Sequence, residues 1–473
     1  MSIEALLAEN TALKAALALR DQALAARDEE LAKLRSEVEE IRRLLKRNST
    51  NSSAPPSSDP PGVGRSKKPK SGKKRGGQPG HRGSFRARVP EERIDHHVPV
   101  PIDGPCGNCG SCEVTGRGVG RRHQTVELPE IRAVVTQYEL ERGRCACCKR
   151  RRSAAPPAEM PAGCMGPRAQ ALVATLTGTF GLSRRDAEQF LSEVLGIDVS
   201  LGTVSATEKF VSEAVAPLHQ EAMAALRRQP VAGVDETGHR REGKRATTWV
   251  GTSPEVAVFL AGMSRARDVF FQLFGESFAG VITTDRYVVY DVIPPERRQL
   301  CWAHLKRAFK ALLDEGGDAV RVGRRLLDNT KTVLKAVRAH RAGALSGPEL
   351  TRTIDASKRE MCWLLSDNRH LPGMRTILEA FVLTPESVWN FTTRNDLDAT
   401  NNMAERDLRR FVIWRKTSFG SQSERGDRFI ERMLTVVTTC RKQGQGLFEL
   451  IVGATRAKLL HHAAPKLLPE PGA

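Results

Sequence analysis

The sequence predicts a multidomain α/β protein, and three observations lead to this prediction. The chain has 473 residues, which is too many for one ordinary hydrophobic core. Short apolar runs in the middle of the chain lead into acidic residues, as buried strands do at the edge of a sheet. Heptads, a Ser- and Pro-rich stretch and paired cysteines come before these runs, so we expect separate modules in front of the sheet domain.

The composition favours a nucleic-acid partner. The net charge of +19 favours a polyanion, and nucleic acid is favoured over an anionic membrane because no amphipathic anchor is evident. No apolar run approaches a transmembrane span, and the N-terminus is a charged heptad rather than a signal peptide, so we expect a soluble, cytoplasmic protein. Ten cysteines, four of them in two CxxC pairs, favour zinc binding over a disulfide framework.

Residues 1–47 are predicted to form a coiled coil. A seam with alternating spacings of three and four residues runs through Ile3, Leu6, Asn10, Leu13, Leu17, Arg20, Leu24, Arg27, Leu31, Leu34, Val38, Ile41 and Leu45. Asn10 falls at an a position and favours a parallel, in-register homodimer, whereas Arg20 and Arg27 at d positions weaken the middle of the seam. The alternative is a single long helix that packs on its own protein.

Residues 48–92 are predicted to form a disordered basic linker. Its first part, rich in Ser, Asn and Pro, cannot bury enough apolar surface to fold alone. Its second part is dense in cations and Gly, and we expect it to contact DNA phosphates without sequence preference. The candidate residues are Lys67, Lys68, Lys70, Lys73, Lys74 and Arg75. The alternative is a solvated tail.

Residues 93–158 are predicted to form a zinc ribbon. Two CxxC pairs flank a stretch that alternates apolar and polar residues at 124–128 and 131–140, as the strands of a ribbon do. The regular pairing favours four thiolate ligands for Zn²⁺: Cys106, Cys109, Cys145 and Cys148. Cys112 and Cys147 are additional thiols, so other ligand sets stay open.

Residues 160–226 are predicted to form a helix-turn-helix-like region. Three short helices are expected at Gln170–Thr177, Arg184–Leu195 and Leu201–Val215, and Ser200 or Thr203 would cap the third. Such a unit often binds DNA, but three-helix units that do not touch DNA are as common.

Residues 228–445 carry the pattern of a sheet domain. Strands are expected at 231–234, 246–252, 255–261 and 281–282, with a helix at 268–274 between the third and the fourth. The first strand leads into Asp235, and the fourth leads through two threonines to Asp285. This order of elements, with acids on the first and fourth strands, is that of a ribonuclease-H-like domain.

A third acid, Glu405, lies in a predicted helix. There Asn402, Glu405 and Arg409 share one face, opposite an apolar face that includes Leu408 and Phe411. Two acids from strands and one from a helix is an arrangement that holds a pair of divalent cations for attack on a phosphodiester, and oxygen ligands suit Mg²⁺ or Mn²⁺. Any one of these acids alone would more often be a turn former or a solvated residue.

The long stretch between Asp285 and Glu405 is predicted to contain an all-helical insertion at about 307–395. Helical periodicity is found at 307–313, 319–345, 348–366 and 373–382. Its arginines, such as Arg321, Arg324 and Arg325, would lie along DNA or form a solvated face.

Several motifs of the chain resemble one known family, the insertion-sequence-66 transposases. They are VDETG with Asp235, TTDRYVVY with Asp285, CWAHLKRAF with His304, and NNMAERDLRRFVIWRKTSFGS with Glu405. The heptads, the NSSAPPSSDPP and GGQPGH segments and the CxxC pairs add to the resemblance. It extends to about residue 445, so residues 446–473 are expected only as a C-terminal tail.

The resemblance implies a catalytic triad of Asp235, Asp285 and Glu405, and it implies that His304 belongs to the active site. A histidine there would orient the scissile phosphate or polarise water, although a hydrogen-bonded core histidine is the alternative. Cations near the third acid are expected to contact DNA: Arg409, Arg415 and Lys416.

The expected function is therefore DNA transposition in the bacterial cytoplasm, in association with the nucleoid. A DDE transposase would cut the element ends by Mg²⁺-dependent hydrolysis and join the freed 3′-hydroxyl to target DNA, with double-stranded DNA and accessory proteins of the same element as partners. A nuclease of the same fold and a catalytically inactive DNA-binding protein are the alternatives. A tyrosine recombinase is disfavoured because Tyr138, Tyr287 and Tyr290 all lie outside the C-terminal third.

Overall fold

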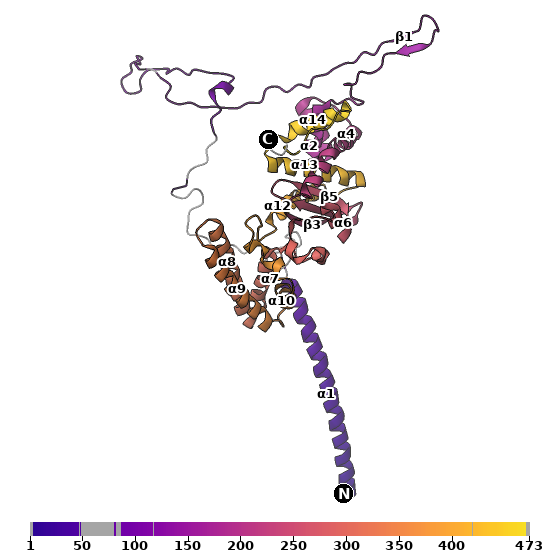
Figure 1. Cartoon of the computed structure of the whole chain (residues 1–473), viewed down its shortest axis with the longest axis vertical. Coiled ribbons are helices and arrows are strands. Elements are labelled where there is room, and N and C mark those ends of the chain that lie inside the picture. Colours follow the sequence, from indigo (N-terminus) through magenta and orange to yellow (C-terminus); the bar gives the residue numbers. More distant parts are fainter. Residues whose placement is uncertain are drawn as a thin grey trace.

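A computed structural model describes residues 3–46, 48, 80–81, 87–116, 118–418 and 420–469 of the chain. Its centre is a mixed five-stranded sheet with the order β5-β4-β3-β6-β7. Two of these strands, β3 and β5, are labelled in Figure 1. The strands are β3 (Val231–Arg241), β4 (Lys244–Thr252), β5 (Ala257–Met263), β6 (Val281–Thr284) and β7 (Arg298–Leu300). β3, β4 and β5 are antiparallel neighbours, whereas β6 and β7 run parallel to β3. The four predicted strands are confirmed, and β7 was not predicted.

The first strand, β3, changes partners along its length. Only Val231–Gly233 pair with β6, whereas the antiparallel pairing with β4 continues to Arg241. The hairpin closes over Glu242 and Gly243, whose φ angles of 50° and 74° give the left-handed turn that a two-residue connection between twisted strands requires. Asp235 therefore lies inside β3, just past the residues paired with β6. The expectation that it ends the strand was wrong, because β4 continues the ladder beyond it.

Helices cover both faces of the sheet. They include α5 (Ala216–Leu226), α6 (Arg267–Phe274), α12 (Asn402–Thr417) and α13 (Glu424–Gln443). Phe411 of α12 packs with Val250 and Phe259 on one face, whereas Val234 and Trp249 join the cluster of α5 and α6 on the other. Because side chains alternate along a strand, Asp235 faces the opposite side from Val234, which is the side of α12. The predicted apolar face of α12 is confirmed.

The edge strand β5 is covered by side chains of α13. Glu431, Thr435 and Thr439 stand on successive turns of the helix and accept hydrogen bonds of 3.0–3.2 Å from alternate backbone N–H groups of β5. These bonds satisfy donors that an edge strand would otherwise leave open to another chain. The sheet is thereby closed on this side.

A helical layer precedes the sheet in the chain. It consists of α2 (Pro167–Gly178), α3 (Arg184–Leu195), α4 (Leu201–Ala214) and α5. The three predicted helices are confirmed. The hydroxyl of Ser200 accepts a hydrogen bond of 3.2 Å from the backbone N–H of Thr203, so Ser200 is the cap of α4.

The C-terminal residues belong to this helical layer. Helix α14 (Leu447–Leu459) packs against α2 and α4, and Ile451 and Leu467 are fully buried. The backbone N–H groups of Leu467 and Leu468 donate to the carboxylate of Glu221 at 2.9 and 3.1 Å. The expectation of a mere tail at 446–473 was wrong for the described part of it, because its apolar residues complete the core.

The helical insertion lies on the side of the sheet away from α14 (Figure 1). Its helices are α7 (Trp302–Glu315), α8 (Gly317–Arg341), α9 (Gly347–Asp367), α10 (Met374–Leu383) and α11 (Pro385–Trp389), and short 3₁₀ turns occur at η3 (Val288–Val292), η4 (Pro295–Arg297) and η5 (Asn390–Thr392). The ring of Trp302 packs edge-on against Trp389 and Phe391 at 5.0 and 5.2 Å between centroids. The predicted helical periodicity is confirmed, and the core of these helices continues into the sheet through Val231, Val281 and Leu300.

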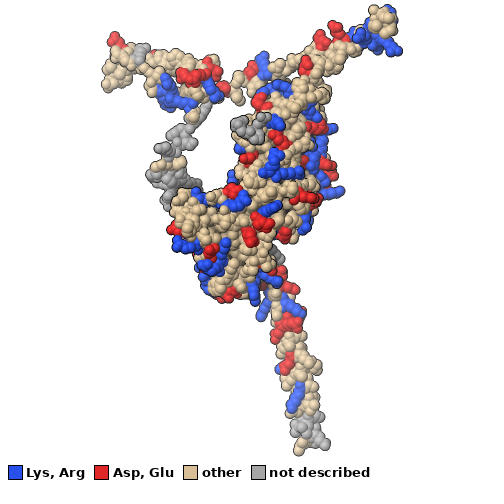
Figure 2. Space-filling model, viewed as in Figure 1, with Lys and Arg blue, Asp and Glu red and all other residues tan. Residues whose placement is uncertain are grey.

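The N-terminal helix α1 (Ile3–Lys46) extends away from the rest of the chain (Figure 1). Its seam residues Leu17, Leu24, Leu31 and Val38 are about half exposed. Both signs of charge alternate along the helix (Figure 2). Nearly all of its described side chains are exposed. None of the described helices is both long enough and apolar enough to cross a membrane.

Residues 87–160 hold little regular structure in their described part. A 3₁₀ turn, η2 (Glu91–Arg93), is followed by a short hairpin of β1 (Arg142–Arg144) and β2 (Arg151–Ser153). The strands expected at 124–128 and 131–140 are not formed, although these residues alternate in polarity. Their apolar side chains, such as Val134 and Val135, remain exposed. Alternation alone does not stabilise strands that have no apolar layer to pack on.

Candidate active site

Asp235 is the contribution of β3 to the site. Two residues earlier on the same face, a Cβ at Gly233 would lie 2.5 Å from a side-chain oxygen at the start of α12, so glycine permits a close approach of this helix. Burial raises the pKa of Asp235 well above its ordinary value, and the negative charges of Glu236, Asp285 and Glu405 raise it further. The three acids predicted from the sequence therefore lie near enough to interact electrostatically.

Asp285 follows β6 and begins a loop whose backbone is held in place. Its Oδ1 accepts a hydrogen bond of 2.8 Å from the backbone N–H of Tyr287. Its carbonyl oxygen accepts hydrogen bonds from Thr284 Oγ1 at 2.7 Å and from the guanidinium of Arg298 at 3.1 Å. Arg298 is buried in β7, a strand that was not predicted from the sequence. Its guanidinium therefore holds the backbone of Asp285 in place.

Asn401, at the start of α12, joins the elements of the site. Its Nδ2 donates to the carbonyl of Val234 in β3 at 2.7 Å, and its backbone N–H donates to Sγ of Cys301 at 3.2 Å. Its carbonyl accepts the N–H of Glu405 at 3.1 Å. This residue was not predicted from the sequence. Its only signal was an asparagine before a helix, which usually caps that helix with its side chain rather than reaching a strand.

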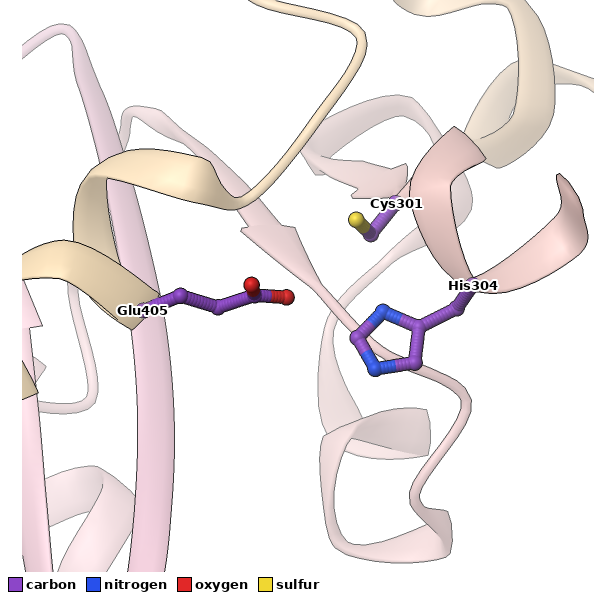
Figure 3. A group of neighbouring side chains, drawn as sticks. All are labelled: Cys301, His304 and Glu405. Carbon is purple, nitrogen blue, oxygen red and sulfur yellow. The ribbon is translucent and has the colours of Figure 1, made fainter. Parts of the chain in front are cut away.

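Glu405 lies in a second cluster with residues at the start of α7. In the described part of the chain, one group of potential metal ligands has its ligand atoms within 4.8 Å of one another: Cys301, His304 and Glu405 (Figure 3). The Glu405 carboxylate is directed toward the His304 ring. Burial, and after it the charge of Arg307, lower the pKa of His304, so the imidazole is neutral at pH 7.

The contacts of Arg307 determine what this cluster can bind. Its Nη1 lies 3.1 Å from Nε2 of His304, and its Nη2 lies 3.5 Å from Oε1 of Glu405. Because a guanidinium only donates, Nε2 accepts and the ring proton is on Nδ1, which is buried without a partner. Sulfur and nitrogen ligands would suit Zn²⁺, but a protonated Nδ1 and an adjacent cation do not. The cluster with Cys301 is therefore not arranged as a zinc site.

The three predicted acids differ from this cluster in their ligand chemistry. Asp235, Asp285 and Glu405 offer only carboxylate oxygens, which Mg²⁺ and Mn²⁺ prefer. Carboxylates that lie near one another repel, and a bound cation relieves this repulsion. Asp235 and Asp285 are not part of the group around His304, so within the described residues the three acids do not form one group of ligand atoms.

The hydrogen-bond partners of Glu236 were not predicted from the sequence. Its carboxylate accepts hydrogen bonds from the hydroxyl of Tyr290 and from Arg265, on the sheet face opposite Asp235. The guanidinium of Arg265 stacks 4.1 Å over the ring of Tyr287. Burial raises the pKa of Glu236. This network connects the residue after Asp235 with the loop after Asp285.

The two CxxC pairs form similar turns. In each, the N–H of the residue after the second cysteine, Gly110 or Lys149, donates to the carbonyl of the first, at 2.8 and 2.9 Å. Backbone N–H groups, chiefly those of Asn108 and Cys148, lower the pKa of Cys106 and Cys145. Such turns suit thiolate ligands. The structure does not bring the two pairs into one cluster.

The residues predicted to contact DNA differ in their surroundings. Arg415 is half-buried, and its guanidinium donates to Oγ1 of Thr237 at 2.8 Å and to the carbonyl of Gly238, so it packs on β3. Arg409 and Lys416 are exposed. The basic linker residues from Lys67 to Arg75 lie outside the described residues. Cations also gather at the tip that carries β1 (Figure 2). They were not predicted to contact DNA, and they are Arg142, Arg144, Arg151 and Arg152.

Comparison with known proteins identifies the family. Residues 162–428, more than half of the chain, match the family described as "Transposase IS66 family". The chain belongs to this family of transposases. The matched residues of this IS66-family transposase include Asp235, Asp285, His304 and Glu405. Residues 2–87 match a second family, whose function is unknown.

Two relatives of this transposase come from Sinorhizobium fredii (strain NBRC 101917 / NGR234). "Uncharacterized protein y4hP" is 25% identical over 384 residues, which cover 72% of this chain and 68% of the relative. "Uncharacterized protein y4qI" is 25% identical over 214 residues, which cover 41% of this chain and 38% of the relative. Neither name describes an activity, so the chemistry has to be argued from the site.

Proposed function

We propose that this IS66-family transposase acts by DDE chemistry. It would hydrolyse a phosphodiester at each end of its element in the presence of Mg²⁺ or Mn²⁺, and it would then direct the freed 3′-hydroxyl onto target DNA. One observation carries this proposal. Asp235 in β3, Asp285 after β6 and Glu405 in α12 are distant in sequence, yet Asp285 and Glu405 both lie near enough to Asp235 for their charges to raise its pKa.

The topology supports the same proposal. The sheet has the order β5-β4-β3-β6-β7, in which the first three strands are antiparallel and the last two run parallel to β3. This order is compatible with the proposed ribonuclease-H-like domain. In such a sheet the acids of β3 and β6 fall side by side at one edge of the parallel part. A helix that packs across this face, here α12, adds the third acid.

Each residue of the site has a definite task in this proposal. Asp235, Asp285 and Glu405 would hold the cations, which when bound activate the attacking oxygen and stabilise the leaving oxygen. The neutral imidazole of His304 would donate a hydrogen bond from Nδ1 to a non-bridging oxygen of the scissile phosphate. Asn401 positions Glu405 against β3, and Glu236 positions the loop of Asp285.

The N-terminal modules would assemble the complex and bind DNA. The seam of α1 would pair two copies of the chain, because its apolar side chains are exposed in the single chain. The CxxC turns would bind Zn²⁺ through Cys106, Cys109, Cys145 and Cys148. The linker cations, together with Arg409 and Lys416, would bind DNA phosphates. Arg415 would instead stabilise β3 through its hydrogen bonds to Thr237 and Gly238.

The proposal is tested with a labelled duplex that carries the element end, the purified full chain and Mg²⁺. Asp235→Asn, Asp285→Asn and Glu405→Gln should each slow cleavage by about a thousandfold or more while DNA binding persists, because loss of one cation ligand removes several kcal/mol of transition-state stabilisation. Asp355→Asn, an exposed acid on α9, is the matched control and should cleave like the parent. Cleavage without strand transfer would indicate a nuclease, and binding without cleavage would indicate an inactive DNA-binding protein.

A further inference from the structure

Glu405 faces a cation of its own chain. Its Oε1 lies 3.5 Å from the guanidinium of Arg307, and its carboxylate belongs to the group with Cys301 and His304 rather than to a group with Asp235 or Asp285. The side chains of Arg307 and Glu405 are 29% and 34% exposed, so both are in partial contact with solvent and neither is enclosed in a core.

The second contact of Arg307 explains why it rests in this position. Its Nη1 donates to Nε2 of His304 at 3.1 Å, and His304 stands one helical turn before it on α7. The guanidinium thus bridges the imidazole and the carboxylate across the gap between α7 and α12. Of the other charged groups that act on His304, Asp285 and Glu405 are acidic and Arg286 is basic.

We propose that Arg307 is a positioning residue that holds Glu405 away from Asp235 and Asp285 until a divalent cation binds. This inference rests on the proposed function, since it concerns the same carboxylate. A guanidinium and a divalent cation compete for one carboxylate, and the ion pair must be given up when Glu405 turns to the cation. Arg307 therefore lowers the affinity for a divalent cation by the free energy of its ion pair with Glu405. It also keeps Glu405 away from Asp235 and Asp285 while no cation is bound.

The test is the affinity of the DNA-free full chain for Mn²⁺, measured from the electron paramagnetic resonance signal of the free ion. Arg307→Gln should bind Mn²⁺ about fivefold more tightly than the parent, the order expected for loss of one competing, partly exposed ion pair. Arg307→Lys, which keeps the charge, should return the affinity toward that of the parent. A role that is merely structural predicts the opposite sign, since a loosened site binds its ion less well.

Two further variants test whether the change in Mn²⁺ affinity comes from the contact between Arg307 and Glu405. Lys310→Gln removes one positive charge from an exposed position on the same helix, one turn after Arg307, and should leave the affinity unchanged. In a Glu405→Gln background the effect of Arg307→Gln should vanish, because the two residues act through one contact. Equal or weaker binding by Arg307→Gln than by the parent overturns the inference alone. Absence of Mn²⁺ binding from both chains overturns the proposed metal chemistry as well.

Discussion

A carboxylate outside the site, Glu431, gives the prediction whose magnitude the structure determines best. Its side chain is 3% exposed, and its oxygens accept hydrogen bonds from the N–H of Ala261 in β5 at 3.0 Å and from Arg428 at 2.8 Å. Burial raises the pKa of Glu431 from 4.5 to about 7. The folded chain therefore holds this proton more tightly than the unfolded chain does.

The sign of the pH dependence follows from linkage. Below pH 4.5 the Glu431 carboxyl makes its full contribution to the free energy of unfolding. This contribution is lost as the pH rises to about 7, and above that pH the free energy lost stays constant. At 1.36 kcal/mol per pKa unit the loss amounts to about 3 kcal/mol. Glu431→Gln cannot ionise, so its unfolding free energy relative to that of the parent should rise by about 3 kcal/mol across this range.

Urea unfolding of parent and variant at a series of pH values measures this difference. The other titrating groups are the same in both chains, so their contributions cancel in the difference between the two unfolding free energies. Any cost of placing an amide beside Arg428 is independent of pH, so it does not change how this difference varies with pH. Glu424→Gln, exposed in the first turn of the same helix, is the control and should show no such trend. A difference that stays constant with pH would refute the reasoning and would mean that the hydrogen bonds to Glu431 fully compensate its burial.

Three further predictions concern other parts of the chain. Deletion of residues 1–47 should shift the sedimentation profile to a smaller species, because the exposed seam of α1 is the proposed dimer contact; an unchanged profile would exclude this role. Cys106→Ser should release bound zinc, as measured by elemental analysis, without unfolding the sheet domain, and parent protein without zinc would contradict the ligand assignment. Gly233→Ala should destabilise the fold by about 1–3 kcal/mol and weaken Mn²⁺ binding, because the added Cβ would lie 2.5 Å from Asn401 Oδ1. Gly453→Ala, where the nearest atom would be 3.6 Å away, should be tolerated, and equal melting temperatures for both variants would count against the close approach of α12.

The strands and the helix that carry the three acids could be predicted from the sequence because their patterns are local. An apolar run before Asp235 and another before Asp285 predict buried strands, and the helical spacing around Glu405 predicts its orientation. The insertion helices were predicted for the same reason, since their periodicity is local. Three-residue β7 was missed, because Arg298 and Gln299 are polar and become strand residues only through pairing with β6.

Tertiary contacts explain the remaining differences. Nothing local indicates that Asn401 bonds β3, that Arg307 bridges His304 and Glu405, or that Arg415 packs on β3 instead of facing solvent. Conversely, the alternating residues at 124–128 and 131–140 suggested strands, but they lack a layer on which to pack. The C-terminal residues were underestimated because α14 and Leu467 are stabilised by helices far away in the sequence.

The central claim is that Asp235, Asp285 and Glu405 share one cation site, and affinity cleavage of the full chain tests it most directly. Fe²⁺ in place of Mg²⁺, with ascorbate and peroxide, generates radicals that cut the backbone beside the bound ion. The account predicts cuts at three places, in β3, after β6 and in the first turn of α12, all suppressed by excess Mg²⁺ and by Asp235→Asn. Cuts near Cys301 alone, or cuts that neither Mg²⁺ nor Asp235→Asn suppresses, would contradict it.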